Sequence, residues 1–326
     1  MMKDTTCPKG YDILTVGFPM VEIMRKERGV PFEKAADFTG PYPSGDTCIL
    51  LDVAARLGKK CCFLGVAGDD LFSDIVLTRL GSDGIDTKYV RKATGYPTAT
   101  VFVRYEKDGK RQYLDLVNQS ACTQLREEDI HPEAVGNAKW IHVSGEILSI
   151  CRDGEGRKAV LQLLESIPED SKLSLDPNFT TDLPNLVEIM EPFVKRADLI
   201  MPSEGEAEKL TGASSDEEAC RILAKAGKII ALKKGKAGCE IYFEEECILI
   251  PPYYIEEIDP TGCGDSFCAG LLCGLIDGKE LFEAGAFANA VGALQAASFG
   301  PMEGARRLHE VEEFMKRSEG TKPYGN

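Results

Sequence analysis

The chain has 326 residues, of which 43% are hydrophobic and 28% charged, and its 38 basic and 53 acidic residues give a formal net charge of −15. This length allows two or three small domains or one large α/β domain with an insertion, and the composition excludes a disordered acidic tail or a collagen-like repeat. The negative charge excludes nucleic acid as a partner. Because no apolar window is long enough to span a membrane, we expect a soluble, cytoplasmic protein.

The cysteines do not have the spacing of a disulfide framework or of a zinc site. Cys61 and Cys62 are adjacent, and Cys263, Cys268 and Cys273 recur at five-residue intervals within an apolar run. The sequence contains no C-x-x-C pair, and no histidine stands beside a cysteine pair. We therefore expect reduced, mostly buried thiols that act as small hydrophobic residues.

The predicted elements alternate between strands and helices. An apolar run over residues 12–17 predicts a buried strand, residues 47–58 have helical periodicity, residues 61–66 predict a second strand, and a Gly-Asp-Asp turn at 68–70 opens another helix. The alternation continues with strands over 140–144, 173–176, 199–201 and 229–232 and helices over 156–166, 185–195, 204–210 and 216–227. This order predicts an α/β fold with a mainly parallel sheet flanked by helices.

Two inserted stretches interrupt the alternation. Strand-forming residues occur within about 18–40, and residues 98–117 predict a β-hairpin whose turn carries Asp108-Gly109. We expect these strands to form a small β-sheet over the carboxyl ends of the parallel strands. Because ligands of open α/β sheets bind at those ends, the small sheet is predicted to act as a lid on a single domain that spans residues 1–326.

The most informative segment is Asp259-Pro260-Thr261-Gly262-Cys263-Gly264-Asp265, which leads directly into an apolar helix. Its glycines and the helix N-terminus bring free backbone N–H groups together, which is typical of a phosphate site. A carboxylate beside such donors is what phosphoryl transfer to a hydroxyl requires. The alternative is a plain helix cap. The usual nucleotide motifs G-x-x-x-x-G-K-[ST] and G-x-G-x-x-G do not occur in the chain.

This segment resembles the C-terminal signature of the ribokinase-like (PfkB) carbohydrate kinases. The resemblance extends along nearly the whole chain, and further blocks follow in the family's order after a first strand that ends in Gly17: Tyr42-Pro43-Ser44-Gly45-Asp46, Gly65-Val66-Ala67-Gly68-Asp69-Asp70, Asp176-Pro177-Asn178-Phe179, Pro202 to Glu206, Lys234-Gly235-Lys236-Ala237-Gly238 and Phe287-Ala288-Asn289-Ala290. The resemblance implies a ribokinase-like fold and an ATP-dependent kinase.

The resemblance also implies roles for particular residues. Asp265 would be the catalytic base, and Gly262, Cys263 and Gly264 would form the anion hole. ATP would lie against Lys234, Gly235, Gly238, Thr261 and Asn289. Ser203, which replaces the family's asparagine, and Glu206 would organise Mg²⁺ through water, and Asp259 would support a monovalent cation such as K⁺. From the residues alone, the Gly235–Gly238 stretch is a turn, and Ser203 with Glu206 is a helix capping box.

The acceptor side departs further from the family pattern. Glu22 stands for the aspartate that binds sugar hydroxyls, whereas Gly45 and Asp46 match members that act on fructose or 2-keto-3-deoxygluconate. Ser44, Ile49 and Thr180 replace a glycine, an asparagine and an arginine of the family. Loss of that arginine weakens the case for an acidic sugar, and Arg104 on the lid is the candidate substitute.

Three hypotheses follow from these residues. The first is an ATP- and Mg²⁺-dependent carbohydrate kinase acting on fructose, 2-keto-3-deoxygluconate or a related sugar. The second is a nucleoside kinase of the same family, with Phe18, Phe102 or Tyr105 forming a base slot. The third is a non-catalytic member that binds a sugar or nucleotide. The exposed strand edge of the lid also predicts a homodimer.

Overall fold

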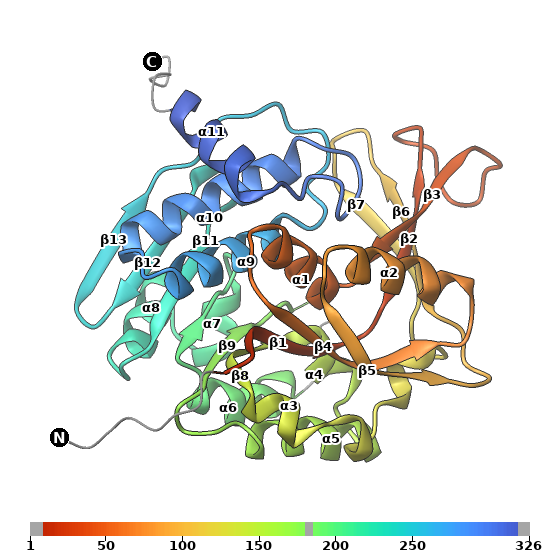
Figure 1. Ribbon diagram of the computed structural model, residues 1–326. Helices are drawn as coiled ribbons and strands as arrows, with labels where there is room; N and C mark the ends of the chain where they lie inside the picture. Colours follow the sequence, from red (N-terminus) through yellow and green to blue (C-terminus); the bar gives the residue numbers. More distant parts are fainter. Residues whose placement is uncertain (1–8, 180–184, 319–326) are drawn as a thin grey trace.

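In residues 9–179 and 185–318, which the computed structural model describes, nine strands form one large sheet in the order β13-β12-β11-β10-β9-β8-β1-β4-β5 (Figure 1). The strands are β1 (Tyr11–Gly17), β4 (Cys61–Gly68), β5 (Asp86–Ala93), β8 (Ala138–Ser144), β9 (Lys172–Asp176), β10 (Leu199–Ile200), β11 (Ile229–Lys233), β12 (Cys239–Phe243) and β13 (Glu246–Ile250). All neighbouring pairs from β5 to β11 are parallel, which confirms the predicted α/β fold class.

Three strands of the large sheet were not expected from the sequence. β12 and β13 form an antiparallel hairpin at one edge, and β5 lies at the other edge. Of the eight residues of β5, only Ala93 is buried, so β5 lacks the apolar run that marks the central strands. Edge strands of this kind have a weak sequence signal because one side of the strand faces water.

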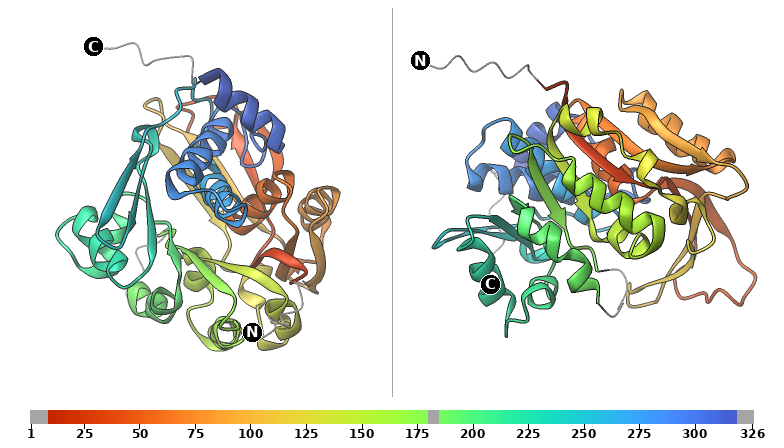
Figure 2. Two further views of the ribbon diagram at one scale, coloured as in Figure 1. Left: turned by 60° about the vertical axis from the view of Figure 1, so that its left-hand side comes forward. Right: turned by 90° about the horizontal axis from the view of Figure 1, so that it is seen from below.

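Helices cover both faces of the large sheet (Figure 2). One face carries α1 (Asp46–Arg56), α2 (Leu71–Ser82), α9 (Cys263–Ile276), α10 (Leu281–Ala296) and α11 (Leu308–Ser318). The other carries α3 (Pro132–Gly136), α4 (Gly145–Ile150), α5 (Gly154–Glu165), α6 (Leu186–Arg196), α7 (Glu206–Thr211) and α8 (Asp216–Ala224). The buried apolar side chains form one large cluster on each face, so the two helix layers are held to the sheet by separate cores.

A second sheet of four strands projects from the side of this body (Figure 1). Its order is β3 (Phe38–Ser44), β2 (Met20–Arg25), β6 (Ala99–Tyr105) and β7 (Arg111–Leu116). β6 and β7 form the hairpin that the sequence predicts. The first insertion extends further than expected, because β3 continues to Ser44 and delivers the chain directly into α1.

The carboxyl ends of the parallel strands bring polar side chains to one edge of the large sheet. Ser144 at the end of β8 pairs in register with Asp176 at the end of β9, and Ser203 forms a bridge to Lys233 at the end of β11. Apolar residues fill the strands behind these positions. The polar ends therefore converge where open α/β sheets bind their ligands.

Cysteine placement agrees with the sequence-based expectation. All eleven cysteines within the described ranges are free, and all of these except Cys247 and Cys263 are buried. Within the same ranges no three His, Cys, Asp or Glu residues are grouped closely enough to hold a metal ion, and no helix is long and apolar enough to cross a membrane.

Candidate active site

The Gly262–Gly264 turn forms the N-terminus of α9. Gly262 adopts the left-handed conformation (φ 75°), and a Cβ at this position would lie 2.3 Å from the Pro301 carbonyl oxygen, so only glycine fits. Over the described residues, the N–H groups of Gly262 and Gly264 have no hydrogen-bond acceptor in the protein. These free donors lie at the positive end of a 14-residue helix, which is a physical basis for binding an anion.

Asp265 lies in the first turn of α9, directly beside these donors. Burial and the charges of Asp46 and Asp176 raise the pKa of Asp265 well above its ordinary value, while Lys233 opposes this shift. A carboxylate with a raised pKa is a better proton acceptor than an ordinary aspartate. Burial also raises the pKa of the neighbouring Cys263 thiol to about 12, so Cys263 stays neutral and contributes its backbone rather than its side chain.

Asp46 lies at the N-terminus of α1, close to the Asp265 carboxylate. Its Oδ2 atom accepts hydrogen bonds from the Ser144 hydroxyl and, at 3.1 Å, from Asn178 Nδ2. Glu146 also shares a hydrogen bond with Asp46, and burial together with the Asp46 charge raises the pKa of Glu146. The preceding Gly45 has a φ of 108°, and a Cβ there would lie 2.6 Å from the Phe18 carbonyl oxygen. Asp46 is thus fixed by partners from two separate segments, residues 144–146 and Asn178.

Lys233 is a largely buried cation beside the Gly262–Gly264 turn. Its Nζ donates to Asp176 Oδ2 at 2.6 Å and to the Cys268 sulfur at 3.8 Å, and a Cβ on Gly264 would lie 3.7 Å from it. Burial lowers the pKa of Lys233, but Asp176, Cys268 and Glu206 together outweigh this effect, so the pKa is raised and the amine stays charged.

Five residues of the site were not expected there from the sequence: Lys233, Asp176, Ser144, Asn178 and Glu146. A signal was available, since Lys233, Asp176 and Ser144 each end a buried apolar strand of the predicted parallel series. Polar residues at such ends converge in space.

Glu206 connects two segments near Lys233. Its Oε2 accepts the Ser203 N–H at 2.7 Å and its Oε1 accepts the Phe179 N–H at 2.8 Å. Burial and the Asp176 charge raise the pKa of Glu206. The expected capping box is altered, because Gly205 rather than Ser203 is the N-cap of α7 while Glu206 still reaches back to Ser203. Thr180 lies outside the described residues.

The predicted nucleotide-side residues lie around β11–β13. Gly235 opens a single turn of 3₁₀ helix, and Gly238 has a φ of 91° with the Ile250 carbonyl oxygen 2.2 Å from where its Cβ would be. Lys234 is ion-paired with Glu240 at 2.6 Å. Asn289, on α10, donates to the Ile250 and Pro251 carbonyls at 3.3 and 3.0 Å, so its amide ties α10 to the end of β13.

Two departures from the family pattern turn out to be partners of each other. Ser44, in the place of a glycine, donates a hydrogen bond of 2.6 Å to Oε1 of Glu22, which stands in the place of an aspartate. Burial raises the pKa of Glu22 to about 7 despite this hydrogen bond. The other oxygen of Glu22 is buried without a partner in the described part of the chain. Ile49 packs against the turn, with its Cγ2 3.3 Å from the Cβ position of Gly262.

One face of the small sheet lies against the anion-binding turn. Tyr105 donates to Asp259 Oδ1 at 2.5 Å, Arg111 donates to Thr261 Oγ1 at 3.4 Å, and Arg28 donates to the Ile258 carbonyl at 3.2 Å. These three contacts hold the small sheet over residues 258–261.

Arg104 lies on the opposite face of the same sheet. The side chains of a strand alternate, so Arg104 points away from the face that carries Tyr105 and donates to Gln112 and Glu106 instead. The structure therefore does not bring Arg104 together with the other candidate residues. The aromatic residues considered for a base slot are also separated: Phe18 is in the core, and Phe102 packs edge-on against Phe38.

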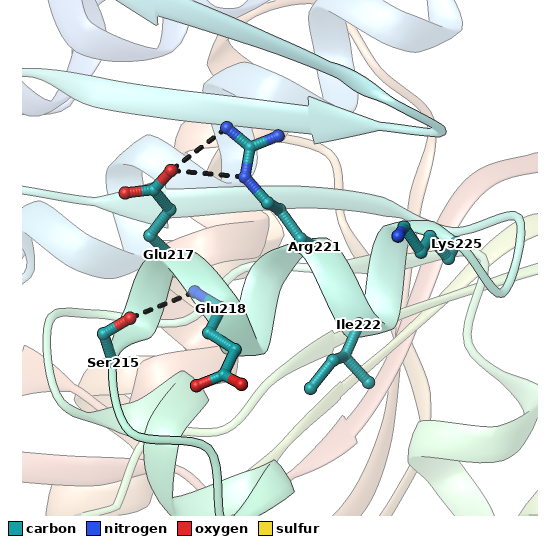
Figure 3. A pocket seen from close by; sticks show the side chains of 6 residues that line it. All are labelled: Ser215, Glu217, Glu218, Arg221, Ile222 and Lys225. Carbon is teal, nitrogen blue, oxygen red and sulfur yellow. Dashed lines mark hydrogen bonds and ion pairs between the residues drawn. The ribbon is translucent and has the colours of Figure 1, made fainter.

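The pocket in Figure 3 lies away from these residues. It has a volume of about 420 Å³ and is lined by Ser215, Glu217, Glu218, Arg221, Ile222 and Lys225. All six belong to α8 or its immediate flanks, and Glu217 and Arg221 form an i,i+4 ion pair at 3.1 Å. This is a solvated helix face, and none of the residues that converge at the strand ends contributes to it.

The fold and site together define a phosphotransferase class, in which a helix N-terminus and an adjacent carboxylate lie between a parallel sheet and a small covering sheet. The model of the pfkB family carbohydrate kinases matches residues 34–307. The chain therefore belongs to the pfkB family of carbohydrate kinases, and it is a sugar kinase.

Individual relatives agree with this assignment. The chain is 30% identical to fructokinase-1 of Oryza sativa subsp. japonica over 93% of this chain and 97% of the relative. A putative ribokinase II from E. coli, solved in complex with ATP and Mg²⁺, superimposes with a TM-score of 0.88 at 31% identity, over 94% of this chain and 99% of that one. A fructokinase double mutant from Vibrio cholerae O395, with bound fructose, ADP and potassium, has a TM-score of 0.82 at 23% identity, covering 95% and 99%.

Proposed function

We propose that this sugar kinase transfers the γ-phosphoryl group of ATP to a hydroxyl of a neutral sugar, with Asp265 as the base. The observation that carries the proposal is the placement of the Asp265 carboxylate in the first turn of α9, beside the free N–H groups of Gly262 and Gly264. Asp265 takes the hydroxyl proton, the sugar oxygen bonds to the γ-phosphorus, the bond from that phosphorus to the bridging oxygen breaks, and ADP leaves. The N–H donors stabilise the charge on the phosphoryl oxygens.

The residues near Glu206 fit a magnesium ion held mainly by phosphates and water. Mg²⁺ keeps several of its waters when bound, so carboxylates nearby can act on it through water. Glu206 and Asp176 supply nearby negative charge and would hold those waters. When bound, the ion would neutralise charge on the phosphates. The proposed ATP site extends from Thr261 past Lys234, Gly235 and Gly238, with Asn289 holding the strand that borders it.

The charges around the acceptor side favour a neutral sugar over a sugar acid. Asp46 and Glu146 lie close to Asp265 there. Asp115 of β7 lies near both Glu146 and Glu22, on the same face of the small sheet as Glu22. Arg104 points to the other face, and Lys233 is already paired with Asp176. A carboxylate substrate such as 2-keto-3-deoxygluconate would be repelled by these acidic groups, and the guanidinium that faces the site, Arg111, already lies near Glu22 and Thr261. Fructose is uncharged, so it is not repelled and needs no guanidinium partner, and its hydroxyls can donate to these carboxylates.

The decisive experiment replaces the base. Asp265→Asn keeps the shape of the side chain but cannot accept the proton, so kcat with fructose and ATP should fall by about 10²- to 10⁴-fold. Asp74→Asn is the matched control, because Asp74 is also an acidic residue in the first turn of a helix but is exposed and paired with Lys92. If Asp265→Asn turned over as fast as Asp74→Asn, the base assignment would be wrong.

We also propose that two copies of the chain pair through the small sheet. β7 is an edge strand, all six of its residues are exposed, and Leu114 and Leu116 point to the face away from the site with 49% and 54% of their surface exposed. An apolar edge strand with unpaired backbone groups favours association with a second copy.

A further inference from the structure

A buried glutamine, to which the proposed reaction gives no role, lies beside the Gly262–Gly264 turn. Gln295 lies on α10 and is fully buried. Its Nε2 donates to the Thr261 carbonyl at 3.0 Å and to the Gly300 carbonyl at 2.7 Å, and its Oε1 accepts the Gly304 N–H at 3.0 Å. One side chain thus bridges the turn before α9 and the loop over residues 300–304.

The two carbonyls belong to Thr261 and Gly300, whose N–H groups both donate to Asp259, the residue for which the family resemblance implies a monovalent cation. Such an ion would need free oxygens, but Asp259 Oδ1 already accepts from the Tyr105 hydroxyl and from the N–H and hydroxyl of Thr261. Asp259 Oδ2 accepts the Gly300 N–H at 2.9 Å. Because the Gln295 amide donates to the Thr261 and Gly300 carbonyls, these oxygens, like those of Asp259, already accept hydrogen bonds from the protein. The residues present therefore do not fit K⁺.

The connection to catalysis runs through the backbone of the turn. The Pro301 carbonyl oxygen lies against Gly262, so the loop that Gln295 holds at Gly300 supports the N-terminus of α9 directly. The Thr261 carbonyl held by the same amide belongs to the residue just before Gly262. A displacement of either carbonyl would move the free N–H groups that receive the phosphoryl oxygens, and a shift of about 1 Å in a positioned group can reduce the rate about 100-fold.

We propose that the Gln295 amide does for the Thr261 and Gly300 carbonyls what a bound monovalent cation would otherwise do, so that this kinase is independent of K⁺. Gln295 is a positioning residue, because it acts through the turn and touches neither sugar nor nucleotide. The inference rests on the proposed function for its kinetic consequences, whereas its prediction about cation binding stands on the geometry alone.

The first test uses the full wild-type chain in KCl and in choline chloride at equal ionic strength. We expect the same melting temperature and the same kcat and KM for fructose and ATP in both salts. A saturable rise in melting temperature with KCl would show that the cation binds, by mass action on the folded state, and would overturn the inference. So would a saturable K⁺ activation of kcat.

The second test removes the amide. Gln295→Ala should lower kcat about 100-fold in choline chloride by loosening the turn, and KCl should restore part of it and raise the melting temperature of this variant alone. Gln295→Glu, which keeps the size but puts an anion beside two carbonyls, should likewise become K⁺-dependent in melting temperature. Gln124→Ala is the control, since Gln124 is only partly buried, its amide donates to Thr123 at the surface, and it is far from the turn in sequence.

The outcomes separate the proposed role of Gln295 from the proposed kinase function. If Gln295→Ala kept wild-type kcat in choline chloride, the positioning role would be wrong. If Gln295→Ala did not fold, the wild-type comparison and Gln295→Glu would still decide the role of K⁺. If the wild type turned over no acceptor in any salt, the proposed function would fail, while the melting temperatures would still report whether the cation binds.

Discussion

The buried pair of Lys233 and Asp176 gives the sharpest quantitative prediction. The two side chains are 11% and 6% exposed, and Nζ and Oδ2 are 2.6 Å apart. Lys233→Met removes the cation and leaves Asp176 as a buried, uncompensated charge. Because the site is desolvated, we expect a loss in the range for broken buried pairs, about 3–5 kcal/mol, rather than the value of about 0–1 kcal/mol for exposed pairs.

The pH dependence of this pair follows from the raised pKa of Lys233. A raised folded-state pKa gives a basic group stabilisation that is fully present below the unfolded-state pKa, near 10.4, and is lost as the pH rises through the folded value. At neutral pH the contribution is therefore complete. Since Lys233 also lowers the pKa of Asp265, its removal should raise that pKa and shift the acid limb of the kcat/KM profile to higher pH.

Urea unfolding followed by fluorescence measures this loss, because Trp140 is the sole tryptophan of the chain and is 6% exposed on β8. With an m-value of roughly 3 kcal/mol/M, the midpoint should fall by about 1–1.7 M. The double variant Lys233→Met, Asp176→Asn should recover most of the loss, because no charge is left buried. Lys236→Met, at an exposed lysine of the same region, should change little. A single variant that lost less than about 1 kcal/mol, or a double variant as unstable as the single, would refute the reasoning.

Three further predictions follow from other contacts. Asp265→Asn should raise the melting temperature at neutral pH while lowering kcat about 10²- to 10⁴-fold. The folded-state pKa of Asp265 is raised, so the native state loses stability as the pH rises from the ordinary aspartate value towards the folded value, and the stabilisation by asparagine should shrink at acid pH, where the carboxyl is protonated in both states. A melting temperature that falls at neutral pH would contradict this. Glu22, with a pKa of about 7, should make the KM for fructose fall as the pH rises through neutrality, and Glu22→Gln should raise KM about tenfold and flatten its pH profile; an unchanged profile would remove Glu22 from the acceptor site. Leu114→Lys should convert the proposed dimer into a monomer by light scattering without lowering kcat, and a wild-type monomer would remove that proposal.

Much of the fold could be predicted from the sequence because the central strands carry continuous apolar runs and the helices carry clear stops. Strand β1 and the β6–β7 hairpin appeared close to where the patterns placed them. β5 and the β12–β13 hairpin were missed because edge strands bury less, and periodicity registers burial rather than backbone pairing. Central strands were thus predicted better than edge strands.

The candidate site could be predicted only where a local motif carried it. The Asp259–Asp265 turn is contiguous in sequence, so its glycines and carboxylate could be interpreted together. Lys233, Glu146 and Gln295 act through partners far along the chain, and each looks ordinary in its own segment. Ser44 looked like a loss when considered alone, although it is the hydrogen-bond partner of Glu22. Such paired substitutions become visible only when distant strands are placed side by side.

The two separate cores also bear on how the chain is made. The core on the α3–α8 face is built largely from the middle of the chain. The other core packs α1 against α9, which in turn packs against α10 and follows α1 by roughly 200 residues. At a ribosomal rate of about 5–20 residues per second, the apolar side of α1 therefore waits roughly 10–40 s for its partners. Synthesis must pass α10 before this layer can close, and the segment that carries Asp265 is among the last to emerge. A nascent chain halted before residue 259 would expose the apolar side of α1 and would lack both the Gly262–Gly264 turn and Asp265. Chaperone binding should therefore be greatest before α9 and α10 have been synthesised.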